Sequence, residues 1–154
     1  MKMLNKREVL FGSAALGGLL LGVAPSYAVD LTGLNDAPAF GEMVLGPDTA
    51  KVTVIEYASA TCPHCAAFYN ETFGTLKKEY IDTGKVRFIL REFPIGHQSG
   101  QATIAMRCAA PGKQLALYEK FMARQAAWVS QEVRLEPIFK IAAEVGMTRA
   151  EFDA

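Results

Sequence analysis

The stretch YASATCPHCAAFYN, residues 57–70, holds two cysteines separated by a proline and a histidine. The preceding run KVTVIEYA, residues 51–58, is rich in β-branched and apolar residues, which predicts a central strand covered on both faces. From Pro63 onward the apolar spacing changes to three and four residues, which predicts an amphipathic helix ending before Gly84. The expected apolar stripe of that helix consists of Cys65, Tyr69, Thr72, Leu76 and Tyr80, with Phe68 and Phe73 flanking it. The cysteine pair therefore lies where a strand gives way to a helix.

A second strand is expected in KVRFILREFP, residues 85–94, where Pro94 ends it. Strand, helix and strand at this spacing predict a βαβ unit with parallel strands, and residues 43–45 are a candidate edge strand. Further helices are predicted for residues 99–110, 113–127 and 137–145. The first has an apolar stripe of Ala102, Ile104, Ala105, Met106 and Cys108, and the second has Gln125 in a mostly apolar stripe. Thr148 and Glu151 have the spacing of a capping box, which predicts one more helix after residue 147. The chain is thus predicted to be an α/β protein.

The first 28 residues have the three parts of a secretory signal peptide. Basic residues come first, an apolar stretch of 15 residues follows at 9–23, and small residues at Ser26 and Ala28 form a cleavage site. An uncleaved membrane anchor is the alternative, but a membrane-spanning helix needs roughly 20 apolar residues. We therefore expect an exported, periplasmic protein cleaved near Ala28, with residues 29–42 as a lead-in segment. In an oxidising compartment, cysteine pairs form disulfides.

Length and charge narrow the class of protein further. A chain of 154 residues suits one domain, and 16 basic residues balance 16 acidic ones, so no nucleic-acid partner is expected. Few strands are predicted, and a last helix opens shortly before Ala154. Because a small parallel sheet would leave an unpaired apolar edge, we expect the sequence to be part of a longer protein.

The spacing of the cysteines points to thiol–disulfide chemistry. Cys62 is expected at the start of the helix and Cys65 one turn inside it, with Pro63 at the first helical position, where its missing N–H costs nothing. Unpaired backbone N–H groups and the helix dipole favour a thiolate at Cys62. The dipole contributes only about 0.3–1 kcal/mol, whereas a pKa change of one corresponds to about 1.4 kcal/mol. A strongly acidic Cys62 therefore also needs N–H···S hydrogen bonds and the His64 imidazole.

Two further side chains leave alternatives open. Glu56 interrupts an apolar strand, so it is either a proton acceptor and electrostatic tuner near Cys65 or a carboxylate bound to Lys51 or to water. Cys108 is the odd cysteine. It is either a buried apolar thiol or a structural cysteine paired with a partner beyond Ala154.

The run VTVIEYASATCPHCAAFYNETF, residues 52–73, and the later VRFILREFP, residues 86–94, resemble the DsbA-like branch of the thioredoxin superfamily. The resemblance implies a thioredoxin-like fold with an inserted helical domain. Residues 43–96 would be the N-terminal part of the thioredoxin-like domain and residues 97–154 a truncated helical insertion. It also implies that Cys62 is the nucleophile, Cys65 its buried partner, and Pro63, His64 and Glu56 the tuning residues.

One departure from the family pattern concerns the end of the chain. The family has a cis-proline that faces the disulfide, followed by two strands, whereas no proline follows Pro137 here. The C-terminal strands of the fold are therefore expected to be missing.

By this resemblance, the Cys62–Cys65 disulfide is exchanged with cysteine pairs of folding exported proteins through a mixed disulfide. A membrane redox partner is expected. Neither a cofactor nor a bound metal is expected. One alternative is a disulfide isomerase or reductase kept reduced by a membrane partner. Another is a metal-binding or structural module, for which the available ligands are Cys62, His64, Cys65, His97 and Cys108. That module is disfavoured because the chain has no second C-x-x-C motif.

Overall fold

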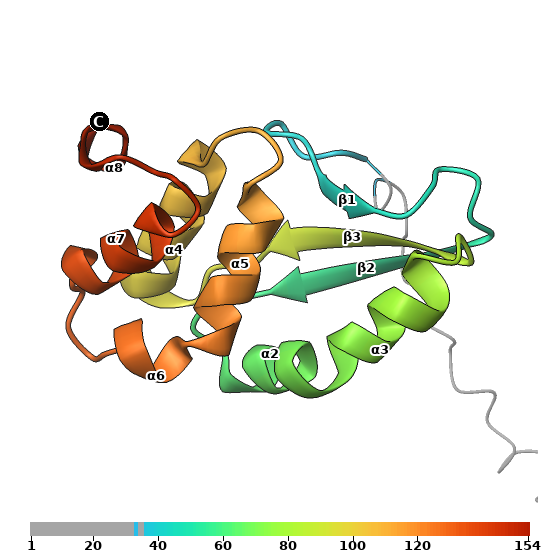
Figure 1. Cartoon of the computed structure of the whole chain (residues 1–154), viewed down its shortest axis with the longest axis horizontal. Helices are drawn as coiled ribbons and strands as arrows, with labels where there is room; N and C mark the ends of the chain where they lie inside the picture. The colour runs from blue at the N-terminus through green and yellow to red at the C-terminus, as the bar shows by residue number, and fades with distance from the viewer. Residues whose placement is uncertain (1–32, 34–35) are drawn as a thin grey trace, which may run out of the picture. The chain divides into compact units, whose positions relative to one another are not determined.

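A computed structural model describes residue 33 and residues 36–154, and Ala37–Ala154 form one compact unit (Figure 1). The predicted signal peptide, residues 1–28, lies outside the described residues, as do positions 29–32, 34 and 35 of the lead-in segment. None of the helices in the described part is long and apolar enough to cross a membrane. In chain order the elements are β1 (Met43–Leu45), β2 (Val52–Ala58), α2 (Pro63–Ala67), η1 (Phe68–Phe73), α3 (Gly74–Leu76), η2 (Lys77–Ile81), β3 (Val86–Glu92), α4 (Gly96–Cys108), α5 (Gln114–Ala123), α6 (Gln125–Trp128), α7 (Leu135–Ala143) and α8 (Arg149–Asp153).

The three described strands form one mixed sheet in the order β1-β3-β2. Strand β2 runs parallel to β3, in a register that pairs Val52 with Val86 and Ala58 with Glu92. Strand β1 runs antiparallel to β3 on the other side and pairs Met43 with Leu90. The predicted parallel strand–helix–strand unit and the short edge strand are therefore confirmed.

The prediction that β2 is the central strand is wrong within the described residues, because β3 takes that place. Strand β3 is buried at Val86, Phe88, Ile89 and Leu90, whereas Val52 in β2 is 53% exposed. A run of β-branched residues favours a strand of either kind. Which strand has neighbours on both sides depends on pairing with distant segments, which the run itself does not specify.

The helix that begins at Pro63 is continuous to Ile81 but contains two π-helical stretches, η1 and η2. In η2 the N–H of Asp82 donates to the carbonyl of Lys77, five residues earlier, at 2.8 Å. A π-helical turn holds more residues than an α-helical turn, so the buried face moves along the sequence. The stripe is therefore correct at Tyr69 and wrong at Thr72 and Tyr80, which are exposed; the buried positions are Ala66, Tyr69, Phe73 and Ile81.

Helices α4 to α7 gather at the carboxyl ends of β2 and β3 (Figure 1). Their shared core is fully buried and consists of Met106, Leu117, Tyr118, Phe121, Met122, Trp128 and Ile138. The predicted stripe of α4 is confirmed at Ala102, Ala105 and Met106 but wrong at Ile104, which is 57% exposed. The predicted capping box at the start of α8 is confirmed, because Thr148 and Glu151 each accept the other's backbone N–H.

Aromatic packing joins the helix that follows the cysteine motif to both the sheet and the helical segment. The rings of Tyr69 and Phe73 stack with their centroids 4.2 Å apart, and the ring centroid of Phe73 lies 5.1 Å from that of Phe88 in β3. The ring of Tyr69 also meets Tyr118 of α5 edge-on at 5.0 Å. These contacts fix the start of the helix against the rest of the unit.

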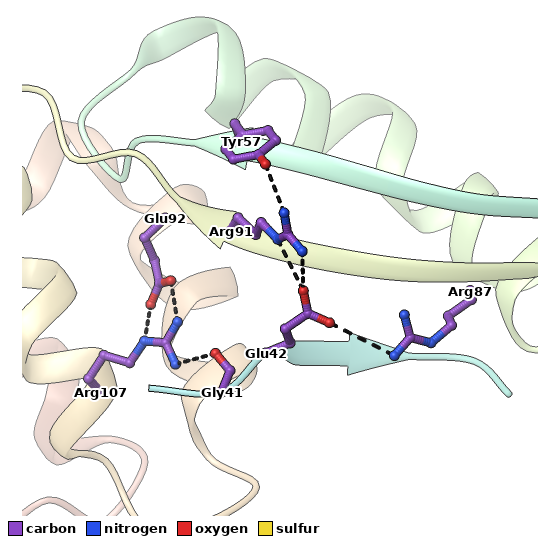
Figure 2. A network of polar contacts seen from close by, with 7 residues as sticks. All are labelled: Gly41, Glu42, Tyr57, Arg87, Arg91, Glu92 and Arg107. Atoms are coloured by element: carbon purple, nitrogen blue, oxygen red, sulfur yellow. Dashed lines mark hydrogen bonds and ion pairs between the residues drawn. The ribbon is translucent and has the colours of Figure 1, made fainter. Parts of the chain in front are cut away.

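A polar network ties the segment before β1 to the sheet (Figure 2). The guanidinium of Arg91, a buried residue in β3, donates from Nε to Glu42 at 3.0 Å and from Nη1 to the Tyr57 hydroxyl at 2.9 Å. Nearby, Arg107 of α4 forms an ion pair with Glu92 and donates to the carbonyl of Gly41 at 3.2 Å. The network holds the strand ends that lead into the cysteine motif.

Candidate active site

Cys62 is the N-cap of the helix that carries the motif, and Pro63 occupies the first helical turn. The backbone of Cys62 is extended, with φ −75° and ψ 119°, and this turns its sulfur back toward the open end of the helix. The N–H of Cys65 donates to Cys62 Sγ at 3.5 Å. Both cysteines are free thiols and partly exposed, so the expectation that Cys65 is a buried partner is wrong in this structure. The structure thus places Cys62 at the helix start and Cys65 one turn inside, where the sequence predicts them.

The pKa of the Cys62 thiol lies below its ordinary value. Burial alone raises this pKa, but hydrogen bonds to the sulfur from the Cys65 N–H, the Cys65 thiol and the His64 N–H lower it by more. The negative charge of Glu56 opposes them weakly. The donors that stabilise the thiolate are therefore mostly those of the helix start, as the sequence predicts.

The pKa of Cys65 moves the other way. Burial raises it, the hydrogen bond to Cys62 raises it further, and the charges of Cys62 and Glu56 add to the same effect. A backbone hydrogen bond from Ser59 offsets part of this rise. Cys62 is consequently more easily ionised than Cys65.

Glu56 lies in β2, and its Oε2 is buried without a hydrogen-bond partner among the described residues. Burial raises the pKa of this carboxyl to about 7. No ion pair joins Glu56 to Lys51 within the described part of the chain, and the carboxylate acts on both cysteines through its charge. These observations support the interpretation of Glu56 as an electrostatic tuner.

The tip of the motif is exposed. Pro63 and His64 both point to the surface, and His64 contributes its backbone N–H to the Cys62 thiolate. The expected contribution of the His64 imidazole stays a prediction. Within residues 36–154, no group of three or more histidine, cysteine, aspartate or glutamate side chains is placed to hold a metal ion.

Cys108 belongs to a different part of the unit. It is the last residue of α4, roughly 18 Å along the helix axis from Gly96. Its side chain is exposed and lies in a small hollow beside Ile104, Met147 and Phe152. The interpretation of Cys108 as a buried apolar thiol is therefore wrong, and its pairing with a cysteine beyond Ala154 stays a prediction.

No local sequence pattern indicates the buried pair of serines behind the motif. Ser59 and Ser99 share a hydrogen bond of 2.7 Å between their hydroxyls, and the N–H of Ile95 donates to Ser59 Oγ at 3.2 Å. Thr61 adds a bond to the carbonyl of Ile95 at 3.3 Å. Together these bonds fix the loop after β2 to the loop after β3.

A second missed residue is Gln125, at the start of α6. Its side-chain nitrogen Nε2 donates to the carbonyls of Ala60 at 2.8 Å and Cys62 at 2.9 Å. The sequence did contain a signal, because Gln125 is a polar residue in an otherwise apolar stripe. Such a residue often serves a buried polar partner.

With this geometry established, comparison with known proteins identifies the class. Residues 39–154 match the sequence model of the family described as thioredoxin, and the chain belongs to that family. The DsbA-like resemblance is confirmed by solved structures. Wolbachia pipientis alpha-DsbA1 superposes with a TM-score of 0.69 and 28% identity, covering 76% of this chain and 60% of that one. The predicted thioredoxin-like fold with an inserted helical region is thereby confirmed.

Two further proteins show similarity to this chain. BdbD from Bacillus subtilis superposes with a TM-score of 0.64 and 25% identity, covering 73% of this chain and 64% of that one. A Rickettsia bellii protein with the provisional name protein-disulfide oxidoreductase is 39% identical over 84 residues. These residues are 54% of this chain but only 32% of that protein. The chain thus spans about a third of the length of that relative.

Proposed function

We propose that this chain is a thiol–disulfide oxidoreductase that exchanges a disulfide between Cys62 and Cys65 with cysteine pairs of other proteins. The observation that carries the proposal is that the pKa values of the two thiols are shifted in opposite directions. Cys62 caps a helix and receives the N–H of Cys65 at 3.5 Å, while Cys65 lies behind it with a raised pKa. The similarity to DsbA proteins supports the same chemistry.

The first step forms a mixed disulfide. A substrate thiolate attacks Cys62 Sγ in the oxidised enzyme, a new S–S bond forms, and the Cys62–Cys65 bond breaks. The electron pair of the broken bond goes to Cys65, which takes up a proton readily because its pKa is raised. Glu56, with a pKa of about 7, is a suitable donor for that proton.

The second step releases the oxidised substrate. The second substrate thiolate attacks the substrate sulfur of the mixed disulfide, and Cys62 departs as a thiolate. Its lowered pKa makes it a good leaving group. The enzyme gains two electrons and the substrate loses two, so a separate oxidant must restore the Cys62–Cys65 disulfide after each cycle.

The setting of this reaction follows from the predicted signal peptide, which lies outside the described residues. We infer that the protein is exported to the periplasm, that its substrates are exported proteins still folding, and that a membrane redox protein reoxidises it. The division into a thioredoxin-like part, residues 43–96, and a helical insertion, residues 97–154, belongs to the same proposal.

The direction of exchange is tested by the reduction potential. The protein is equilibrated with mixtures of reduced and oxidised glutathione, and the fraction of the Cys62–Cys65 disulfide is measured. An oxidase requires a potential well above the value of about −270 mV typical of thioredoxin. A value near or below that figure overturns the oxidase assignment in favour of a reductase or isomerase.

A further inference from the structure

The side-chain amide of Gln125 spans the turn that carries Cys62. Its Nε2 is within hydrogen-bonding distance of two main-chain carbonyls, those of Ala60 and Cys62, at 2.8 and 2.9 Å. A primary amide nitrogen has two N–H donors, so this geometry uses both. The residue is half-buried, and it comes from the helical segment more than sixty positions along the chain. The amide therefore joins the helical segment to the redox motif.

Gln125 lies at the junction of α5 and α6, and hydrogen bonds hold this junction in place. Trp128 is fully buried, and its indole N–H donates to the carbonyl of Phe121 at 2.9 Å. The side chain of Gln98 donates to the carbonyl of Trp128 and accepts the N–H of Ser130 at 2.8 Å. These bonds hold the junction on both sides of Gln125, so its amide is aimed at the motif before any substrate binds.

The Cys62 carbonyl also accepts a second hydrogen bond, from the helix backbone. It accepts the N–H of Ala66 at 3.1 Å, which is the first hydrogen bond of the α2 helix. With Gln125 as a second donor, both lone pairs of this oxygen are used. The orientation of the Cys62 peptide is thereby fixed in the extended conformation that directs Sγ toward the N–H of Cys65.

The two bonds matter more in the reduced enzyme than in the oxidised enzyme. Carbonyl oxygens carry partial negative charge, and those of Ala60 and Cys62 belong to the turn that carries Cys62, whose sulfur is anionic only after reduction. Donors on these oxygens offset that charge and hold the sulfur among its own N–H partners. An interaction that favours the thiolate but has little effect on the neutral disulfide shifts the equilibrium toward the reduced enzyme.

We propose that Gln125 is a positioning residue for disulfide exchange, which holds the Cys62 turn through the carbonyls of Ala60 and Cys62 and thereby makes the disulfide more oxidising. The inference rests on the proposed function. It assigns to the helical segment a direct part in setting the reactivity of Cys62.

The test compares Gln125→Met with the wild-type chain. Methionine has nearly the shape of glutamine but no donor, and Gln131→Met, at an exposed glutamine, is the matched control. Two quantities are measured. The thiol pKa of Cys62 comes from thiolate absorbance in chains that also carry Cys65→Ser and Cys108→Ala, and the equilibrium constant with glutathione comes from chains that keep both motif cysteines. We expect Gln125→Met to raise the thiol pKa and to make the disulfide about three- to tenfold less oxidising, the worth of one or two hydrogen bonds. Gln131→Met should match the wild type.

The inference is overturned if Gln125→Met keeps the wild-type thiol pKa and glutathione constant while both redox forms lose equal thermal stability. That result would mean that Gln125 only stabilises the fold and does not affect the reactivity of Cys62. Should Gln125→Met fail to fold, Gln125→Asn decides on the same readouts, since its side chain is one methylene too short to span both carbonyls. Wild-type values in Gln125→Asn overturn the inference. A wild-type chain without disulfide exchange contradicts the proposed function itself, before any variant is made.

Discussion

The backbone N–H of Cys65 lies 3.5 Å from the sulfur of Cys62, and this contact makes the two cysteines unequal. It stabilises negative charge on Cys62, while burial and the charge of Cys62 disfavour a second thiolate at Cys65. A pair of thiols one helical turn apart is thereby divided into an attacked sulfur and a resolving sulfur.

The first prediction concerns the division of roles between these sulfurs. Cys65→Ser should accumulate mixed disulfides with substrate proteins, because the thiol that would resolve them is absent. Cys62→Ser should form none when both variants also carry Cys108→Ala, because the accessible nucleophile is gone and the exposed Cys108 cannot replace it. Non-reducing electrophoresis after incubation with an unfolded substrate protein that carries disulfides detects the adducts, because the Cys62 thiolate attacks a substrate disulfide and one substrate thiolate leaves. Adducts that form through Cys65 in the Cys62→Ser protein would contradict the assignment.

The second prediction concerns the pH dependence that Glu56 imposes on stability. Its pKa is raised to about 7 by burial, so the folded state holds a proton that the unfolded state has already lost. The stability this provides is complete at pH values below the unfolded pKa of about 4.3 and is lost as the pH rises toward 7. Glu56→Gln removes the loss, so the variant should unfold at a higher temperature than wild type at pH 8.

The measurement is thermal unfolding of both proteins from pH 4 to pH 8. The advantage of Glu56→Gln should shrink steadily toward pH 4, where the wild-type carboxyl is neutral as well. Glu71→Gln, at an exposed glutamate on the helix after the motif, is the control and should show no such trend. An advantage independent of pH would mean that the charge of Glu56 is not its cause.

The third prediction concerns the two carboxylates that pair with the arginines of β3. The Glu42 side chain is 10% exposed beside Arg91, whereas that of Asp48 is 90% exposed beside Arg87. Glu42→Gln should cost about 1.5–3 kcal/mol of unfolding free energy, because the hydrogen bonds from the buried Arg91 guanidinium lose their charged acceptor. Asp48→Asn breaks an exposed pair and should cost about 0–1 kcal/mol. Urea unfolding measures the free energy of unfolding of both variants. Equal costs would show that burial does not determine how much each ion pair contributes.

The fourth prediction concerns the serines behind the motif. Ser59→Ala removes the partner of the buried Ser99 hydroxyl and of the Ile95 N–H. Leaving buried groups unpaired should lower the free energy of unfolding by about 1–3 kcal/mol. Thr72→Ala, on the exposed face of the following helix, provides the comparison and should have little effect. A wild-type urea midpoint for Ser59→Ala would show that water replaces these bonds at no cost.

Much of this architecture follows from local sequence patterns. The strand–helix–strand unit, its parallel pairing and the Thr148–Glu151 cap depend on short stretches of sequence, so they are predictable. The position of Cys62 at a helix start follows from Pro63 in the same way. The DsbA-like resemblance extends the prediction from these elements to the fold.

Features that depend on distant contacts were predicted less well. The apolar run of β2 does not reveal that, among the strands of residues 36–154, β3 is the one with neighbours on both sides. The π-helical turns after Ala67 move the buried face away from Thr72 and Tyr80, and they leave no simple mark in the sequence. The contact of Gln125 with the motif depends on how α5 and α6 meet, which periodicity within one helix does not describe.

The most direct test of the account is a titration of the Cys62 thiol. In a chain carrying Cys65→Ser and Cys108→Ala, Cys62 is the sole thiol of the sequence, and its ionisation is followed by ultraviolet absorbance. We expect a pKa clearly below the value of about 8.5 found for cysteine in unstructured peptides. A pKa at or above that value would mean that the start of the α2 helix does not hold Cys62 as a thiolate.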